Sequence, residues 1–371
     1  MKYYLIAGEA SGDLHASNLM RALRTEDPAA EFRCWGGDLM EAAGGVVVKH
    51  YRDLAFMGFI EVALNLRTIL RNFRLCQKEL MSWKPDVLIL VDYPGFNLGM
   101  AKFANTHGIR VFYYISPQLW AWRSSRVKKI KKYVERMFVI LPFEKDFYAR
   151  HDYEVDYVGH PLPDAIAASS AVTPAAFRES NHLDDRPIIA LLPGSRAQEI
   201  PVMLETMLRV IPGFPQYQFV IAAAPSILPD FYDPIIKGRQ VRIVTGQTHD
   251  LLRNAEAALV TSGTATLETA LFGVPEVVCY KGNPLSVCIA RQIIHVNFIS
   301  LVNLIMGREI VKELIQHDLT PEKVSEELGK ILNEPGKTRI KNDYVEMAKV
   351  LGGHGASART AHLMVQYLKT K

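Results

Sequence analysis

Short apolar runs alternate with segments of helical periodicity along the whole chain. Uninterrupted apolar runs of this length are typical of strands whose two faces are both covered. Strands that alternate with helices in this way indicate parallel sheets and the α/β class of fold. The predicted strands are Tyr3 to Ala7, Phe32 to Trp35, Val46 to Val48, Val87 to Val91, Val111 to Ile115, Phe138 to Leu141, Ile188 to Leu192, Phe219 to Ala223, Val241 to Val244, Ala257 to Val260 and Glu276 to Tyr280.

The alternation breaks near the middle of the chain. The stretch Gly159-His160-Pro161-Leu162-Pro163 and the Ala/Ser-rich segment after it interrupt the pattern, and strand–helix units resume at Pro187. A chain of 371 residues is long enough for two domains with separate cores. We therefore expect doubly wound domains over residues 1–165 and 166–345, with a cleft between their carboxyl strand ends, and a helical segment over 346–371.

Composition and charge exclude several classes of protein. The net charge of +4, from 43 basic and 39 acidic residues, is too small to indicate nucleic-acid binding. The N-terminus lacks the pattern of a secretory signal, and no apolar run approaches the roughly 20 residues that span a bilayer. The cysteines Cys34, Cys76, Cys279 and Cys288 have no metal-ligand spacing and are typical of core residues in a reducing compartment. We expect a cytoplasmic protein, or one attached to a membrane from that side.

Two turns in the second half of the chain point to a nucleotide. The segments Leu192 to Arg196 and Ser262 to Glu268 each follow an apolar run and lead into a helix, where backbone N–H groups favour an anion. Arg196 would neutralise phosphate, and Glu268 would accept hydrogen bonds from ribose hydroxyls. Either motif alone also fits an ordinary strand–helix turn, but together they predict a nucleotide-diphosphate pocket. The predicted binding residues are Gly194, Ser195, Arg196, Glu199, Ser262, Gly263, Thr264, Ala265 and Glu268.

The first turn of the chain, Gly8-Glu9-Ala10-Ser11-Gly12-Asp13, directly follows a predicted strand. It lacks the G-x-G-x-x-G pattern, and no acidic residue ends a second strand about 20 residues further on, so a nicotinamide site is disfavoured. Its glycines would let a ligand approach the backbone closely, and Ser11 would cap a helix that begins near Leu14. Helix capping alone would also explain Ser11 and Asp13.

Asp92 ends the most apolar strand of the first half, Val87 to Val91. A carboxylate at the carboxyl end of a parallel strand faces the crevice of an α/β fold, where it can take a proton from an acceptor hydroxyl. We therefore predict that Asp92 is a general base. The alternative is an aspartate that caps a helix or anchors a loop.

Aromatic and basic residues give two further hypotheses. Trp120 and Trp122, beside Arg123, would form either a wall that faces a sugar or acyl group, or core packing. Two segments, Glu61 to Trp83 and Arg123 to Arg136, combine an apolar stripe with a basic one, and this pattern suits either an anionic membrane surface or a solvated helix face. The predicted membrane contacts are Met57, Phe59, Ile60, Arg67 and Arg71.

These motifs together resemble the lipid-A-disaccharide synthase family, the bacterial glycosyltransferases of lipopolysaccharide assembly. The matching stretches are IAGEASGD, MGFIEV, VDYPGFN, SPQLWAWR, LLPGSRAQEI, SGTATLE and SLVNLIMGREIVKEL, in the family's order from residue 6 to about residue 314. The resemblance implies a GT-B type fold of two Rossmann-like domains with an interdomain cleft. It also implies an inverting hexosyltransferase that joins UDP-2,3-diacylglucosamine to the 6-hydroxyl of 2,3-diacylglucosamine 1-phosphate (lipid X), which gives UDP and a β-1′,6-linked disaccharide 1-phosphate.

The family's site residues carry over motif by motif. Asp92 matches the essential aspartate, Arg196 the PGSR arginine, and Asn303 the asparagine of an NL motif near the nucleotide. Glu9 and Ser11 belong to the loop that faces the cleft, and together with Asp92 they are the predicted catalytic residues. The chain departs from the family pattern at Tyr93, Gly95 and Val302.

The resemblance also sets expectations about mechanism and partners. Arg196 and backbone donors would stabilise the departing UDP while Asp92 activates the acceptor hydroxyl. No Asp-x-Asp pair stands out in a suitable turn, so no metal or other cofactor is expected. The expected partners are the two lipid substrates, an anionic membrane surface at the cytoplasmic face of the inner membrane, and a second copy of the chain with which the helical C-terminus exchanges. A UDP-sugar 2-epimerase of the same fold and a non-enzymatic nucleotide-sugar-binding protein are the alternatives.

Overall fold

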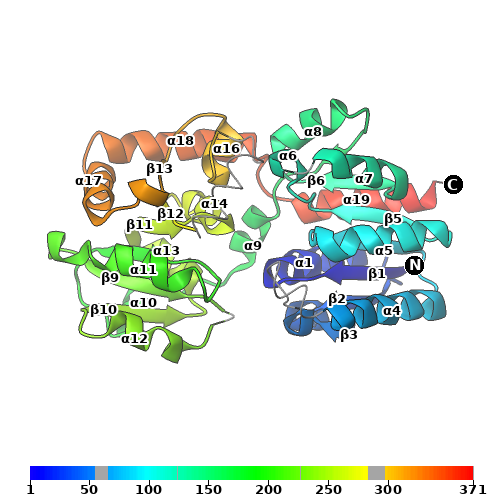
Figure 1. Ribbon diagram of the computed structural model, residues 1–371, viewed down its shortest axis with the longest axis horizontal. Coiled ribbons are helices and arrows are strands. Elements are labelled where there is room, and N and C mark those ends of the chain that lie inside the picture. The colour runs from blue at the N-terminus through cyan, green and yellow to red at the C-terminus, as the bar shows by residue number, and fades with distance from the viewer. Residues whose placement is uncertain (55–65, 123, 226, 283–296, 371) are drawn as a thin grey trace. The chain divides into compact units, whose positions relative to one another are not determined.

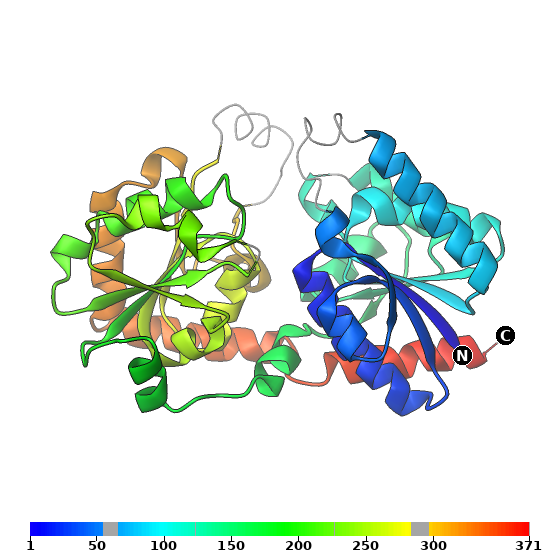
Figure 2. The same ribbon diagram turned by 90° about the horizontal axis from the view of Figure 1, so that it is seen from below.

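The computed structural model describes residues 1–54, 66–122, 124–225, 227–282 and 297–370 (Figure 1). It divides into two compact units, the first formed by Met1–Ala167 with Gly352–Lys371 and the second by Ala168–Leu351. Each unit has a parallel sheet with helices on both of its faces, as Figure 2 shows. The prediction of an α/β fold with two doubly wound halves is therefore confirmed.

Within the described residues, the first unit has a seven-stranded parallel sheet in the order β3-β2-β1-β4-β5-β6-β7. The strand order reverses between β1 and β4, which are paired from Tyr3 with Val87 to Ala7 with Val91. The strands are β1 (Lys2–Ala7), β2 (Glu31–Gly36), β3 (Val46–His50), β4 (Val87–Val91), β5 (Arg110–Tyr114), β6 (Arg136–Val139) and β7 (Asp156–Tyr157).

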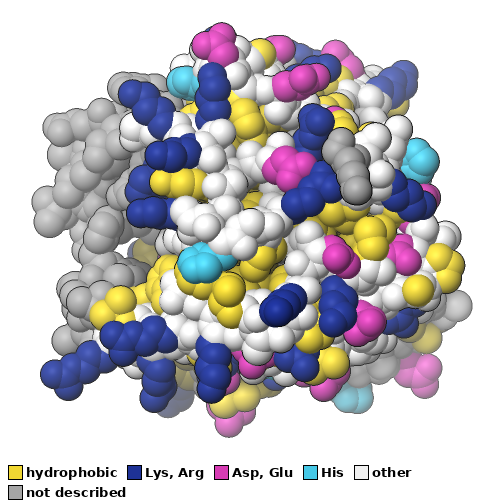
Figure 3. Space-filling view, turned by 90° about the vertical axis from the view of Figure 1, so that its right-hand side faces the viewer, with side chains coloured by type: hydrophobic (Ala, Val, Ile, Leu, Met, Phe, Trp, Pro, Cys, Tyr) yellow, Lys and Arg dark blue, Asp and Glu magenta, His cyan; other side chains and the backbone are white. Residues whose placement is uncertain are grey.

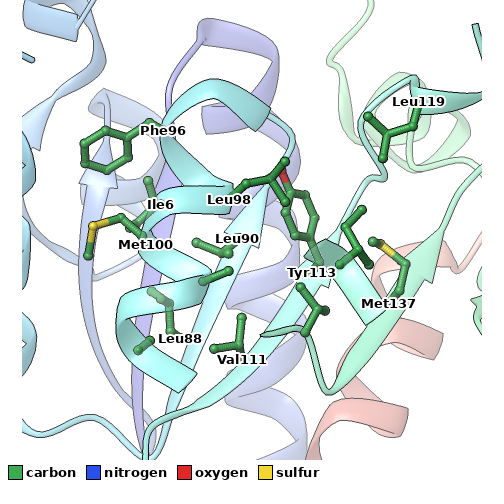
Figure 4. Close-up of a cluster of buried hydrophobic side chains, with 14 of the residues drawn as sticks. Ile6, Leu88, Leu90, Phe96, Leu98, Met100, Val111, Tyr113, Leu119 and Met137 are labelled. Carbon is green, nitrogen blue, oxygen red and sulfur yellow. The ribbon is translucent and has the colours of Figure 1, made fainter. Parts of the chain in front are cut away.

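Helices of the first unit cover the apolar faces of this sheet. They are α1 (Ala10–Glu26), α2 (Asp38–Ala42), α4 (Leu66–Trp83), α5 (Pro94–Thr106), α6 (Leu119–Trp122), α7 (Val127–Tyr133), α8 (Pro142–Ala149), α9 (Leu162–Ala168) and α19 (Ala356–Lys369). Figure 4 shows apolar side chains of α5 in one buried cluster with those of the central strands. The Tyr113 hydroxyl points from this cluster towards the carboxyl ends of the strands (Figure 4). Because these strands are buried on both faces, their sequences read as continuous apolar runs.

The second unit repeats this arrangement with the sheet order β10-β9-β8-β11-β12-β13, again parallel. Its strand order reverses between β8 and β11. The strands are β8 (Ile188–Leu192), β9 (Gln218–Ala223), β10 (Val241–Thr245), β11 (Ala255–Thr261), β12 (Glu276–Tyr280) and β13 (Lys312–Ile315). The helices are α10 (Pro174–Ser180), α11 (Ile200–Leu208), α12 (Asp233–Ile236), α13 (Thr248–Asn254), α14 (Thr264–Leu271), α16 (Leu301–Met306), α17 (Pro321–Leu332) and α18 (Gly336–Val350).

The end of the chain returns to the first unit, where α19 packs on α1. The Asp164 carboxylate accepts hydrogen bonds from the backbone N–H groups of Gly355 at 2.6 Å and Ser357 at 3.1 Å. These bonds satisfy donors at the start of α19 that the helix itself leaves without a partner. The helical segment expected over 346–371 is thus split, since α18 belongs to the second unit and α19 to the first.

Two sequence expectations about the chain as a whole concern its cysteines and membrane spans. Cys34, Cys76 and Cys279 are free and buried, as predicted, and Cys288 lies outside the described residues. In the part of the chain that the structure describes, no helix is both long enough and apolar enough to cross a membrane.

Candidate functional site

The first candidate site lies where the strand order of the first unit reverses. The turn after β1 carries Gly8 and Glu9, and the turn after the neighbouring strand β4 carries Asp92 and Tyr93. In doubly wound sheets, ligands bind outside the carboxyl ends of the strands at this reversal. We call these four residues the Asp92 site.

The backbone at this edge of the sheet adopts an unusual conformation. Asp92 has φ +43° and Tyr93 φ +49°, and Ile115, directly after the adjacent strand β5, has φ +63°. Residues other than glycine rarely adopt a left-handed backbone conformation, and for a β-branched isoleucine it is a clear outlier. Strain of this kind persists only where the surroundings enforce it, and it gathers at functional sites.

Two buried side chains hold the Asp92 backbone in place. The Asp92 carbonyl accepts hydrogen bonds from Asn97 Nδ2 at 2.7 Å and from the Tyr113 hydroxyl at 2.6 Å. Asn97 also donates to the carbonyl of Val91 at 3.3 Å. These hydrogen bonds anchor the backbone of Asp92 and do not involve its carboxylate. The residue at the N-cap position of α5 is Tyr93, so the helix-capping alternative for Asp92 is wrong.

The electrostatic surroundings of Asp92 suit proton transfer. Burial, together with the nearby negative charge of Glu9, raises the pKa of the Asp92 carboxyl to about 7, although a hydrogen bond from the Tyr93 backbone acts in the opposite direction. A general base works best when its pKa lies near the operating pH. The Asp92 carboxylate combines a pKa near neutral pH with a position where the strand order reverses.

Gly8 is required by the packing of the Asp92 site. A Cβ atom at Gly8 would lie 2.4 Å from the ring of Tyr93, which is closer than any real contact. Glycine therefore lets the half-buried Tyr93 ring lie directly on the first turn of the chain. Burial, and then the charge of Glu9, raises the pKa of Tyr93.

The capping interpretation of the first turn needs correction. Helix α1 begins at Ala10 with Glu9 at its N-cap, so Ser11 lies within the first helical turn, exposed, and does not cap a helix that starts near Leu14. The prediction missed the early start because the Gly-rich segment is itself helical. Asp13 does cap a helix, but a different one: its carboxylate accepts from the N–H groups of Gly37 at 2.7 Å and Met40 at 3.1 Å, at the start of α2.

The second candidate site lies at the strand reversal of the second unit. Gly194, Ser195 and Arg196 follow β8, and Ser262 to Ala265 follow the adjacent strand β11. Gly194 has φ +103°, a conformation that favours glycine. Helix α14 begins at Thr264, with Gly263 at its N-cap and both residues exposed, so its first N–H groups face solvent. We call this set, with Glu199 and Glu268, the Arg196 site.

Arg196 forms an ion pair with Glu199, at 2.8 Å between Nη1 and Oε1. The Arg196 side chain is 62% exposed, whereas that of Glu199 is 24% exposed. An exposed pair of this kind contributes at most about 1 kcal/mol, so a phosphate group can compete for the guanidinium. Glu199 thus holds Arg196 beside the turn without blocking it.

The remaining side chains of the Arg196 site have defined partners. Glu268 Oε1 lies 2.6 Å from His249 Nε2, and both side chains are partly buried. The Ser262 hydroxyl donates to the carbonyl of Ile299 at 2.9 Å, and this bond ties the turn to the segment before α16. The sequence did not single out His249, because nothing in its local motif marks it.

Asn303 has a structural role inside the second unit. Its side chain is fully buried: Oδ1 accepts from the N–H groups of Ile310 at 2.8 Å and Val311 at 3.0 Å, and Nδ2 donates to Glu313 at 2.9 Å. Every hydrogen-bonding group of the amide is therefore used inside the second unit. Here Asn303 fixes the loop between α16 and β13, and its predicted role at the nucleotide stays a prediction.

Several predicted residues lie either outside the two sites or outside the part of the chain that the structure describes. Met57, Phe59 and Ile60 lie outside the described residues, while Arg67 and Arg71 are exposed on α4. Trp120 packs edge-on against Phe143, with ring centroids 4.9 Å apart, which fits the packing interpretation of that aromatic. Among the described residues, no three His, Cys, Asp or Glu side chains are arranged to hold a metal ion.

The fold and its two sites define the class of the protein. Two parallel α/β units, each with a candidate site at its strand reversal, form the GT-B type architecture of glycosyltransferases and UDP-sugar epimerases. The chain is similar in fold to the glycosyltransferase of kitacinnamycin, with a TM-score of 0.67, 14% identity and 99% of each chain covered. It is also similar to a putative UDP-N-acetylglucosamine 2-epimerase from Listeria monocytogenes, with a TM-score of 0.68, 12% identity, and 100% of this chain and 97% of that chain covered.

Sequence comparison narrows the class to one family. The family model described as lipid-A-disaccharide synthetase matches residues 3–366. The lipid-A-disaccharide synthase of Trichlorobacter lovleyi is 39% identical over 376 residues, which cover 98% of this chain and 97% of that protein. The chain belongs to the lipid-A-disaccharide synthase family, whose members are glycosyltransferases of lipid A biosynthesis.

Proposed function

We propose that the protein transfers 2,3-diacylglucosamine from its UDP conjugate to the 6-hydroxyl of 2,3-diacylglucosamine 1-phosphate. The products are UDP and a β-1′,6-linked disaccharide 1-phosphate, with inversion at the anomeric carbon. Family membership supports the reaction class. We assign Asp92 as the base because its pKa is raised and because it lies where the strand order of the first unit reverses.

Asp92 acts on the acceptor. Its carboxylate accepts the proton of the 6-hydroxyl while that oxygen forms a bond to the anomeric carbon of the donor. With a pKa of about 7, a substantial share of Asp92 is ionised near neutral pH and is still basic enough to take the proton. Attack from the face opposite the leaving group converts an α-linked donor into a β-linked product.

The Arg196 site acts on the leaving group. As the bond between the anomeric carbon and the phosphate oxygen breaks, negative charge develops on the UDP diphosphate. The Arg196 guanidinium and the N–H groups at the start of α14 stabilise that charge, since both are fixed before the reaction begins. Glu268, oriented by His249, accepts hydrogen bonds from the ribose hydroxyls.

An epimerase is the second candidate, and the observations do not favour it. The similarity to the epimerase from Listeria monocytogenes rests on 12% identity and concerns the fold. The identity to the lipid-A-disaccharide synthase of Trichlorobacter lovleyi is 39% over nearly the whole chain. A binding protein without activity does not require an aspartate with a left-handed backbone and a pKa of about 7.

We further propose that the protein works at the cytoplasmic face of a membrane, because both substrates carry acyl chains. We also propose that it is a homodimer. Helix α4 supports the first part: Arg67, Arg71 and Arg74 are exposed, and Leu70 between them is 49% exposed. Basic residues beside exposed apolar ones suit an anionic lipid surface. Reduced binding of Arg67→Gln/Arg71→Gln to phosphatidylglycerol vesicles would support this assignment, and unchanged binding would contradict it.

One assay separates the candidate functions. The protein is incubated with UDP-2,3-diacylglucosamine, with and without 2,3-diacylglucosamine 1-phosphate, and the products are analysed by mass spectrometry. The proposal requires a disaccharide phosphate that forms only when the acceptor is present. An epimerase would convert the donor, without the acceptor, into an epimer of equal mass that proton NMR of the recovered UDP-sugar detects. A binding protein would leave both compounds unchanged.

A further inference from the structure

Helices α5 and α7 of the first unit enclose a pocket of about 450 Å³ beside the Asp92 site. Its wall carries five cationic side chains and, among the lining residues that the structure describes, no Asp or Glu. The cations are Lys102, Arg126, Lys128, Lys129 and Lys132. We call this the α5–α7 pocket.

The lysines of the α5–α7 pocket have no carboxylate partner among the residues that the structure describes. Within the described part of the chain, none of the ion pairs involves Lys102, Lys128, Lys129 or Lys132. Lys128 and Lys132 are four residues apart on α7, a spacing at which like charges destabilise a helix. Such an arrangement is stabilised when an anion occupies the pocket.

Figure 3 views the first unit from the side on which the two chain termini lie, and several Lys and Arg side chains gather at the upper left of the view. The pocket also includes Pro94 and Gly95 at the start of α5. The amino end of a helix carries partial positive charge, which adds to that of the lysines.

The α5–α7 pocket begins at the start of α5, next in the chain to the Asp92 site. Pro94 and Gly95 follow Asp92 by two and three residues. The positive charge of Arg126 lies close enough to Tyr113 to oppose the rise in the pKa of its hydroxyl. That hydroxyl donates a hydrogen bond to the Asp92 carbonyl at 2.6 Å. From Pro94 to Lys102 the pocket follows α5 for about 12 Å, at the helical rise of about 1.5 Å per residue. The pocket therefore extends from the residues that follow Asp92 in the chain to the lysines.

We infer that the α5–α7 pocket binds the phosphate monoester of the acceptor, with Lys102, Lys128 and Lys132 as its cationic ligands. This inference rests on the proposed function, which gives the acceptor a phosphate on carbon 1 and a reacting hydroxyl on carbon 6. Carbons 1 and 5 flank the ring oxygen, and carbon 6 is attached to carbon 5, so the phosphate and the 6-hydroxyl are both carried at the ring-oxygen edge of the sugar. A phosphate in the pocket thereby orients the 6-hydroxyl towards Asp92.

The pocket also gives a physical basis for choosing the acceptor. A phosphate monoester carries nearly two negative charges at neutral pH and has several strong acceptor oxygens. A sugar without the phosphate would leave the lysines unpaired, and it would bind more weakly for that reason. The pocket therefore distinguishes an acceptor with a free 1-phosphate from the same sugar without one.

The kinetic test compares two double variants that remove the same charge. Lys128→Gln/Lys132→Gln changes the pocket, and Lys131→Gln/Lys145→Gln changes exposed lysines outside it. With a short-chain acceptor phosphate, the pocket variant should raise the acceptor KM about tenfold or more, with kcat and UDP affinity within twofold of the parent. The control should match the parent throughout. An unchanged acceptor KM in the pocket variant, with an unchanged melting temperature, would overturn the inference.

A binding test separates this inference from the proposed function and from membrane attachment. Calorimetric titration with glucosamine 1-phosphate, glucosamine, and phosphatidylglycerol vesicles requires no turnover. The inference expects the parent to bind the sugar phosphate but not glucosamine, and the pocket variant to lose that binding. This result would stand even if no disaccharide were formed, in which case only the proposed function would fail. If the pocket variant kept sugar-phosphate binding and lost only vesicle binding, the pocket would be a membrane contact and the inference would be wrong.

Discussion

His249 Nε2 and Glu268 Oε1 lie 2.6 Å apart in the second unit, on helices α13 and α14. The contact joins residues that are 19 positions apart, and the imidazole also packs at 5.2 Å from the ring of Phe272. Both side chains are partly buried, so the contact fixes one carboxylate oxygen of Glu268. His249 is thus a positioning residue for the group that we assign to the ribose.

The first prediction concerns this contact. His249→Ala should weaken UDP binding by about threefold to tenfold, because one hydrogen bond contributes about 0.5–1.5 kcal/mol. Isothermal titration calorimetry with UDP measures the effect, and Glu268→Ala should give a loss at least as large. His317→Ala, an exposed histidine of the same unit, serves as the control. If His249→Ala bound UDP like the parent while Glu268→Ala did not, the positioning role would be excluded.

Arg196 gives a second prediction about UDP. Arg196→Ala should reduce UDP affinity by roughly 1.5–3 kcal/mol, the contribution of a hydrogen bond to a charged group. Arg196→Lys should recover only part of this loss, because an ammonium lacks the planar fork that matches a phosphate. Arg209→Ala is a matched control, since Arg209 is also 62% exposed and paired with a glutamate on the same unit. Equal UDP affinities for Arg196→Ala and Arg209→Ala would place the diphosphate elsewhere.

The pKa of Asp92 predicts opposite pH dependences for activity and stability. Since the base must be ionised, kcat should fall as the pH drops below about 7. Folding raises this pKa from 3.8, so the folded state resists ionisation, and stability is lost as the pH rises from about 4 to 7. Asp92→Asn should therefore raise the melting temperature relative to the parent, by more at pH 8 than at pH 4. A melting-temperature difference that stays constant with pH would show that this pKa is not raised.

Gly8 provides a structural test of the Asp92 site. Gly8→Ala would force the Tyr93 ring away from the first turn, because the added Cβ would lie 2.4 Å from it. We expect kcat to fall by at least tenfold, with UDP affinity unchanged because the Arg196 site belongs to the other unit. Gly329→Ala, on α17 with no atom within 4 Å of the added Cβ, should leave kcat unchanged. A normal kcat for Gly8→Ala would mean that the position of Tyr93 does not matter for transfer.

The sequence predicted the central strands better than the outer ones. β4 begins and ends where the apolar run Val87 to Val91 does, because a strand buried on both faces must be apolar throughout. The outer strands β7 (Asp156–Tyr157) and β13 (Lys312–Ile315) were missed, since they are short and contain charged residues. An edge strand need not be a continuous apolar run, so the pattern missed these two, although it did predict the other two edge strands, β3 and β10.

The same distinction holds for the candidate sites. Asp92 and Arg196 could be found from the sequence because each directly follows a strand that the apolar pattern marks. Tyr113 and His249 could not, because their partners are distant in the chain and only the folded structure brings them together. The internal hydrogen bonds of the Asn303 amide were likewise not visible in its motif, because the fold brings Ile310 and Glu313 to it.

The most direct test of Asp92 as the base is a single-turnover rate of disaccharide formation by Asp92→Asn. The amide has nearly the same shape as the carboxylate and cannot accept the proton of the 6-hydroxyl. The account predicts a rate about 100-fold or more below that of the parent, within the range of general-base effects, with UDP affinity unchanged. A rate within a few-fold of the parent at saturating substrates would contradict it and remove Asp92 from the chemistry.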